Sequence, residues 1–286
     1  MFGKMGKKGK FFSLLGVVIF AAAVYFIYQN VVYVSTDNAT IQGHTLMIAS
    51  KVPGIVQAVQ VQENQEVKEG QVLVKLDPRD LNNAIAQIDA ELGSSEARLH
   101  DAETNYRRIS DLYKKGAGSQ QQYDTASAAF KDVSKRFHGI QAQLDEAKLN
   151  LSYTEVKAPS DGVIARKSVE PGMVIPAGQP LLGFVESHTR WVTANFKETE
   201  LPDIAIGGRA TIEVDAIPHK KFTGEVESIS PSTGAVFTLL PPDNSTGNFT
   251  KVVQRVPVRI KLHDLTPQDI ALLQVGLSAD VWVRKH

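Results

Sequence analysis

Two stretches far apart in the chain, residues 53–77 and 159–185, share one pattern of glycines and apolar residues. Each matching position in the second stretch lies 108 residues after its counterpart in the first. Runs of β-branched residues predict short strands, and Gly or Asn at the corners predicts left-handed backbone there. A stretch this short cannot bury its apolar side alone, so the two must pack together into one small sandwich. The repeated corner positions are Gly54, Asn64 and Gly70 in the first stretch, and Gly162, Gly172 and Gly178 in the second.

The region between the two stretches, residues 79–155, has a different period. Mostly apolar residues recur at alternating intervals of three and four from Leu81 to Tyr113, and again from Tyr123 to Thr154. Two such runs of more than four heptads predict two coiled-coil helices of roughly 50 Å each. Glycines in the segment 114–119 stop the first helix and Ser119 can cap the second. The sequence therefore predicts an antiparallel helical hairpin inserted between the halves of the sandwich.

The N-terminus has the features of a membrane anchor. Residues 1–10 contain four lysines and no acid, and residues 11–28 are uncharged and largely apolar. Extended slightly toward Val34, this run is long enough to span a bilayer, and the lysines place its start in the cytoplasm. Three tyrosines would lie at the far interface: Tyr25, Tyr28 and Tyr33. The alternative is a cleaved signal peptide, because the small residues 21–23 are typical of a cleavage site.

The C-terminal part predicts a small β-barrel, because short alternating stretches such as 191–196, 210–214 and 256–260 are separated by glycines. The expected fold class is mostly β, with an inserted α-helical coiled-coil hairpin and an N-terminal transmembrane helix. The expected regions are a stub and anchor, strands leading into the sandwich, its first half, the hairpin, its second half and the barrel: 1–34, 35–52, 53–78, 79–155, 156–186 and 187–286.

Composition excludes several functions. Lys and Arg number 31, as do Asp and Glu, so the basic surplus typical of nucleic-acid binders is absent. There is no cysteine, which excludes disulfides, thiolate chemistry and a lipoprotein anchor. The seven histidines show no metal-ligand spacing, and no nucleophile elbow, phosphate loop or dinucleotide fingerprint occurs. We therefore expect no enzyme activity, no metal and no cofactor.

Several segments resemble known proteins. The split repeat with its inserted hairpin resembles the biotinyl/lipoyl-like domain of the membrane fusion proteins of the haemolysin D family. The segments 36–43, 191–200 and 237–260 resemble the EmrA-type branch of these adaptors, 191–200 reading WVTANFKETE. Arg108, Leu112 and Ser119 have the spacing of the family motif at the hairpin tip. The resemblance implies that these three side chains contact a TolC-type outer-membrane channel.

The resemblance implies a periplasmic adaptor in the bacterial inner membrane, crossing it once. Its implied partners are an inner-membrane multidrug exporter of the major-facilitator type, the outer-membrane channel, and further copies in a trimer-based ring of six. An adaptor for an ABC-type secretion system or for aromatic-acid export is the nearest alternative. A lipoyl or biotinyl carrier would need a lysine on the turn that the hairpin replaces, and Lys75 and Lys157 lie only near that junction. A purely structural coiled coil is the third alternative.

Overall fold

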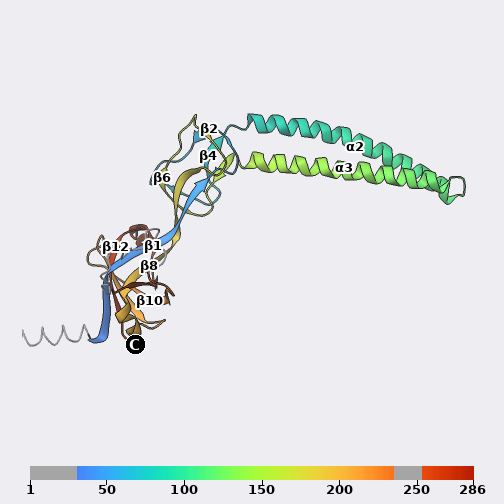
Figure 1. Ribbon diagram of the computed structural model, residues 1–286. Coiled ribbons are helices and arrows are strands. Elements are labelled where there is room, and N and C mark those ends of the chain that lie inside the picture. Colours follow the sequence, from blue (N-terminus) through green and yellow to red (C-terminus); the bar gives the residue numbers. More distant parts are fainter. Residues whose placement is uncertain (1–30, 235–252) are drawn as a thin grey trace, which may run out of the picture. The chain divides into compact units, whose positions relative to one another are not determined.

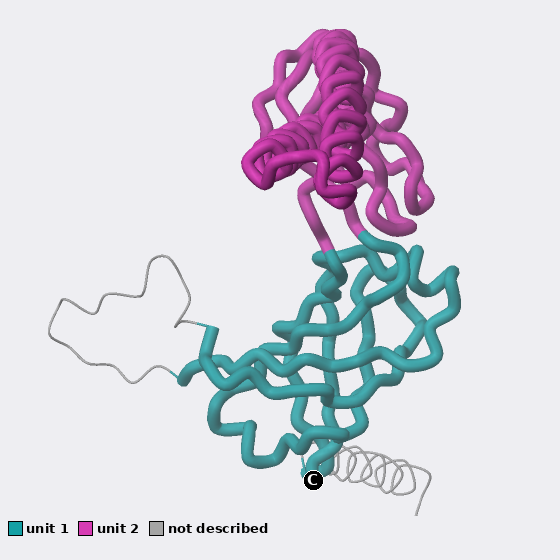
Figure 2. Tube along the Cα trace, turned by 90° about the vertical axis from the view of Figure 1, so that its right-hand side faces the viewer, with its two compact units in different colours: residues 1–44, 186–286 teal, residues 45–185 magenta. Residues whose placement is uncertain are grey.

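The computed structural model describes residues 31–234 and 253–286. The chain forms two compact units, residues 1–44 with 186–286 and residues 45–185, and it passes between them twice (Figure 2). Two long strands carry these passages, β1 (Tyr33–Ala49) and β8 (Pro180–Lys197). The first unit thus takes in much of the stretch 35–52.

The expected anchor, residues 11–28, lies outside the described residues. Within them, no helix has the length and hydropathy needed to cross a membrane. Val31 and Val32 are helical, and β1 already begins at Tyr33, where it pairs with Arg284. The extension of the spanning segment toward Val34 is therefore wrong, because strand pairing holds Tyr33 and Val34 in the barrel.

The first unit is a β-barrel with an apolar interior. Its strands follow the order β1-β12-β9-β10-β11-β8, and a further pairing between β1 and β8 closes the ring. Alternate residues of each strand point inward, as period-2 patterning requires; Val192, Ala194 and Phe196 of β8 are fully buried. The predicted barrel is confirmed. Its remaining elements are η1 (Glu198–Asp203), β9 (Arg209–Val214), β10 (Lys221–Ile229), β11 (Arg255–Leu262), α4 (Pro267–Leu272) and β12 (Ser278–Arg284).

The second unit contains the sandwich, built from strands of both repeated stretches. The first stretch supplies β2 (Gly54–Val59), β3 (Glu66–Val67) and β4 (Val72–Leu76). Across the unit these pair with strands that follow the hairpin: β7 (Val174–Ile175), β6 (Gly162–Lys167) and β5 (Glu155–Lys157). Val56, Leu73, Ile164 and Leu181 belong to one buried cluster. The two stretches therefore share a single core, as their repeat predicts.

The repeated corner positions have two different physical roles. Asn64 and Gly172 occupy equivalent corners with φ of 64° and 88°, and Gly70 and Gly178 likewise, with 75° and 83°. Gly54 and Gly162 do not have left-handed backbone, so the expectation of positive φ is wrong for this pair. Both are the first residues of strands. A Cβ on Gly162 would lie 2.3 Å from the Phe184 ring, so close packing explains this glycine.

The inserted region forms the predicted helical hairpin. Helix α2 (Arg79–Lys114) has 36 residues and α3 (Gln120–Ser152) has 33, and they run side by side (Figure 1). At 1.5 Å per residue, α2 extends for about 54 Å. The residues buried along the contact are small or aliphatic: Ser95, Ser110, Ala126, Ile140 and Leu144. All except Ser110 are positions of the predicted heptad seam.

Candidate functional site

The free end of the hairpin is a short turn with well-defined caps. Gly116 has a φ of 71°, and the Ala117 N–H donates to the Leu112 carbonyl at 2.9 Å, which ends α2. Ser119 begins α3 as a capping box: its hydroxyl accepts from the Gln122 N–H at 3.2 Å, and the Gln122 side chain accepts from the Ser119 N–H at 3.2 Å. The turn therefore holds the two helix ends in a fixed geometry.

The three residues of the expected tip motif lie around this turn. Leu112 is in the last turn of α2 and Arg108 lies four residues before it, which places both on one helix face. Leu112 is 42% exposed, and Arg108 is exposed with no ion-pair partner in the described part of the chain. Ser119 is exposed but already caps α3. The structure thus leaves Arg108 and Leu112 available for a partner and gives Ser119 a structural role as well.

An aromatic cluster supports the same end of the hairpin. Tyr113 stacks on Tyr123 with ring centroids 5.1 Å apart, and Tyr106 stacks on Phe130 at 5.4 Å. The hydroxyls of Tyr106 and Tyr123 form a hydrogen bond of 3.2 Å across the two helices, which raises the pKa of Tyr123 above its ordinary value. Tyr113 is 39% exposed beside Leu112. Sequence reasoning misses this exposure, although aromatics spaced seven residues apart mark the distal seam.

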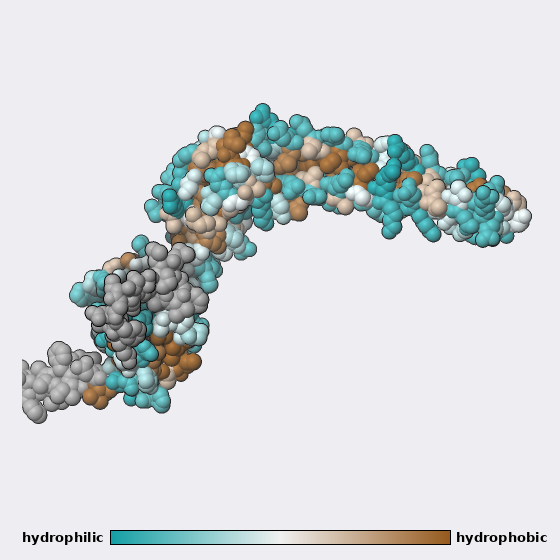
Figure 3. Space-filling model, in the orientation of Figure 1, coloured by the Kyte–Doolittle hydropathy of each residue, from teal (hydrophilic) through white to brown (hydrophobic). Residues whose placement is uncertain are grey.

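Side chains around the turn are mostly polar. On the face seen in Figure 3, hydrophilic residues predominate at the free end of the hairpin. Arg107 pairs with Glu103 four residues earlier at 2.5 Å. Lys114 and Lys115 stand at the C-terminal end of α2, where positive charge offsets the helix dipole. This end therefore combines a small apolar surface with charged side chains of both signs, including the exposed Asp111 and Asp124.

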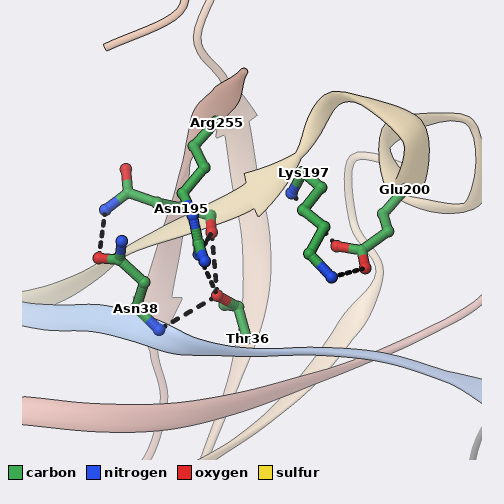
Figure 4. Close-up of polar contacts among 6 residues, drawn as sticks. All are labelled: Thr36, Asn38, Asn195, Lys197, Glu200 and Arg255. Atoms are coloured by element: carbon green, nitrogen blue, oxygen red, sulfur yellow. Dashed lines mark hydrogen bonds and ion pairs between the residues drawn. The ribbon is translucent and has the colours of Figure 1, made fainter. Parts of the chain in front are cut away.

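A second polar site is an open groove of about 410 Å³ in the barrel. Thr36 anchors one side: its hydroxyl donates to the Asn195 carbonyl at 2.9 Å and accepts from the Asn38 N–H at 3.1 Å (Figure 4). Arg255 donates to the same Asn195 carbonyl at 3.2 Å. Lys197 pairs with Glu200 at 3.6 Å on the other side of the view. These contacts join β1, β8 and β11 around the groove.

The charges in this groove are mixed. Burial raises the pKa of Asp280 above its ordinary value, and the nearby carboxylates of Asp215, Asp37 and Glu213 raise it further. Across residues 31–234 and 253–286, no three His, Cys, Asp or Glu side chains are grouped to hold a metal ion. Its ion pair and hydrogen bonds mainly join the ends of neighbouring elements.

The positions considered for a carrier lysine are strand residues. Lys75 lies in β4 opposite Glu155 of β5, and Lys157 lies in β5 and pairs with Glu155 at 3.0 Å. The chain between β4 and β5 is the hairpin itself.

Known proteins share this arrangement of hairpin, sandwich and barrel. Residues 44–186 match the model of the barrel-sandwich hybrid domain of RND membrane fusion proteins. That match covers half of the 286 residues. The chain belongs to the membrane fusion protein family. Residues 189–236 also match a CusB-like β-barrel domain. The resemblance inferred from the sequence is confirmed, and the protein is a periplasmic adaptor, of a family that is generally non-enzymatic.

Relatives of this adaptor cover nearly its whole length. The colistin resistance protein EmrA of Acinetobacter baumannii is 31% identical over 95% of this chain and 92% of its own. The multidrug export protein EmrA of Haemophilus influenzae is 32% identical over 97% of this chain and 84% of its own.

Solved structures show the same fold. A membrane fusion protein from Streptococcus pneumoniae superposes with a TM-score of 0.65 at 17% identity, covering 89% of this chain and 99% of the other. A MacA–MexA chimera that carries the Pseudomonas aeruginosa MexA α-hairpin gives 0.57 at 19% identity, covering 89% of this chain and 79% of the other.

Proposed function

We propose that this adaptor links an inner-membrane drug exporter of the major-facilitator type to a TolC-type outer-membrane channel. Residues 11–28 anchor it in the inner membrane, the barrel and anchor engage the exporter, and the hairpin tip docks on the channel. The relatives whose names refer to colistin resistance and multidrug export support drugs as the cargo. The adaptor contributes docking geometry, and the exporter supplies the energy.

The observation that carries the proposal is the free end of the hairpin. Arg108 and Leu112 stand exposed beside a capped turn, at the end of a helix about 54 Å long. An unpaired guanidinium can donate several charge-assisted hydrogen bonds to carbonyls or carboxylates of a partner. A leucine beside it adds apolar contact. Together they form a small but specific docking surface.

Assembly into a ring follows from the need for a sealed path. A single narrow hairpin cannot enclose a conduit, whereas several copies side by side can. We propose a trimer-based ring of six copies in which sandwiches stack laterally and hairpins stand in parallel. Closed symmetry of this kind is the rule for soluble homo-oligomers.

The test replaces Arg108 with Asp in the full-length protein, in cells without another copy of the adaptor. Loss of a charge-assisted hydrogen bond costs about 1.5–3 kcal/mol, roughly tenfold or more in affinity for the channel. We expect lower drug resistance and weaker cross-linking from the tip to the channel at an unchanged protein level. Arg98→Asp is the matched control, because Arg98 is also exposed on α2 and lies ten residues nearer the sandwich. Equal resistance in both variants would contradict docking at this tip.

A further inference from the structure

One end of the barrel brings together chain segments that are distant in sequence. The Lys285 N–H donates to the Val32 carbonyl at 2.9 Å, and the His286 N–H donates to the Asp203 carbonyl at 3.3 Å. The Lys285 ammonium also pairs with the Asp203 carboxylate at 3.0 Å. These contacts hold the start of β1, the end of β12 and the end of η1 at a single end of the barrel.

This end carries two largely exposed apolar side chains. Ile206 is 70% exposed, in the turn between η1 and β9, and Val31 is 65% exposed just before β1. Gly207, with a φ of 82°, makes the tight turn that carries Ile206, and its N–H donates to the Val226 carbonyl at 2.8 Å. Tyr33 is half-buried beside them. Ile206 and Val31 together form a small apolar surface at this end of the barrel.

Two arginines border these apolar residues. Tyr33 pairs with Arg284 across β1 and β12, and Val283 pairs with Ala210 across β12 and β9. Arg209 and Arg284 therefore stand at the same end of adjacent strands. Both are exposed, and neither has an ion-pair partner within the described ranges.

The carboxylates at this end are mostly engaged elsewhere, since Asp203 pairs with Lys285 and Glu200 with Lys197. Glu225 faces His263 at 3.6 Å, while Glu198 is exposed. The four cationic side chains at this end, Lys197, Arg209, Arg284 and Lys285, are equal in number to the four carboxylates, so apolar contact rather than net charge dominates this surface.

The sequence fixes how far this end can lie from the anchor. The uncharged run 11–28 ends three residues before Val31. Three residues reach at most about 10 Å when extended. The polar layer on each side of a bilayer's hydrocarbon core is roughly 5–8 Å thick. If residues 11–28 span the membrane, Val31 lies at or just above the headgroups, and the rest of this barrel end lies close to them.

We infer that this end of the barrel rests on the lipid surface, with Ile206 and Val31 in the headgroup layer. Arg209 and Arg284 lie over lipid phosphates. This inference rests on the proposed inner-membrane anchor and adds a second contact with the bilayer. Aliphatic side chains flanked by arginines suit an interface in which apolar and phosphate groups alternate. The contact restricts tilting of the barrel about its short tether.

The absence of native cysteine allows a direct test with single-cysteine variants of the full chain. Ile206→Cys, Leu272→Cys and Ala22→Cys are each labelled with an environment-sensitive fluorophore and placed in nanodiscs of phosphatidylethanolamine and phosphatidylglycerol. Spin-labelled lipid then quenches any label that touches the bilayer. Leu272 is the matched control, because it is 54% exposed in the same unit. Its neighbour Leu273 accepts a hydrogen bond from Arg190, and Arg190 lies beside Gly43. Gly43 is ten residues along β1 from Tyr33, so Leu272 is far from the end of the barrel that carries Ile206.

We expect quenching at residues 22 and 206 and at least a twofold weaker effect at 272. Quenching at 22 with none at 206 would overturn the lipid contact and leave the anchor intact. No quenching at 22 would overturn the anchor and the inference together. A second variant set, Arg209→Ala with Arg284→Ala, tests the phosphate contacts. Each arginine near an anionic lipid surface raises the affinity for that surface roughly fivefold, so the double variant should show weaker quenching at residue 206. Unchanged quenching at residue 206 would refute the role of the two arginines.

Discussion

The hairpin and the barrel of this adaptor are stabilised in opposite ways. In the hairpin each residue meets neighbours along one seam, and only five residues of the two helices are buried: Ser95, Ser110, Ala126, Ile140 and Leu144. In the barrel the first strand pairs with the last, Tyr33 with Arg284, and every strand faces one closed core. A defect in the hairpin should therefore remain local, whereas a defect in the barrel disturbs the whole ring.

The chain allows both regions to be followed in one sample. It contains two tryptophans, Trp191 and Trp282, and both lie in barrel strands. Helical circular dichroism at 222 nm reports mainly α2 and α3. Urea titration with both probes therefore measures barrel and hairpin stability side by side.

The largest loss of stability is expected in the barrel, for Gly224→Ala in β10. A Cβ at this position would lie 2.4 Å from the Lys261 carbonyl oxygen and 3.1 Å from the Ile260 side chain. The obstacle is backbone of the paired strand β11, which cannot move without opening the barrel. Overpacking of this kind costs about 3 kcal/mol. Tryptophan fluorescence should shift to lower urea while the helical signal keeps its midpoint. A coincident shift of both signals would show that the two regions unfold as one.

The next effect is expected in the hairpin, for Leu144→Ala. Leu144 is 2% exposed, and its removal leaves a cavity in the seam that costs about 2–3 kcal/mol. Here the helical signal should weaken at lower urea, while tryptophan fluorescence stays unchanged. Leu149→Ala in the same helix is the control, because Leu149 is 50% exposed and should cost far less. Equal losses for the two leucines would disprove the seam.

Gly139→Ala in α3 is expected to stabilise the hairpin rather than destabilise it. Apart from its chain neighbours and the backbone of its own helix, no atom of the described residues lies within 4 Å of a Cβ built at Gly139, and the residue is in the helix interior. Alanine restricts the unfolded chain and is favoured in helices over glycine by about 1 kcal/mol. The helical midpoint should therefore rise. Gly93, which is equally open in α2, should behave alike and the two gains should add. A loss in either variant would mean that a partner helix contacts that face.

The contrast between the regions also explains what can be predicted from the sequence. The hairpin is predictable because a helical seam follows intervals of three and four, which assign Ser95, Ile140 and Leu144 correctly. Strand content in the barrel is also visible, through alternation in 191–196 and 210–214. Sequence-based prediction fails where contacts between residues distant in the chain determine which residue is required. Gly162 is required by the Phe184 ring, and no local pattern reveals that contact.

Other features depend on long-range pairing in the same way. Tyr33 and Val34 continue an apolar run, yet pairing with β12 turns them into strand. Arg190 is 9% exposed and donates to the Leu273 and Glu186 carbonyls, which no charge pattern indicates. The tip motif can be proposed from its spacing, since Arg108, Leu112 and Ser119 fall within one hairpin end. The exposure of Tyr113 follows from the turn geometry, which the spacing does not reveal.

The smallest effect tests electrostatics in the barrel, with Asp280→Asn. Burial and neighbouring acids raise the pKa of Asp280 in the folded state, so the ionised carboxylate destabilises the barrel. This penalty is complete above the folded-state pKa and vanishes below the unfolded value of about 3.9. The amide variant should therefore be more stable at pH 7, by at most about 0.5 kcal/mol because the side chain keeps some solvent contact. The gain should disappear near pH 3.

Tryptophan-monitored melting at both pH values measures this difference where it arises, since Trp282 lines the same groove as Asp280. Asp132→Asn removes one negative charge from an exposed position of α3 and serves as the control. Its effect on the tryptophan transition should be negligible at both pH values. A gain for Asp280→Asn that persists at pH 3 would mean that amide packing, rather than relief of buried charge, stabilises the groove. Packing rather than charge would then determine the stability of the barrel at this position, as it does at Gly224.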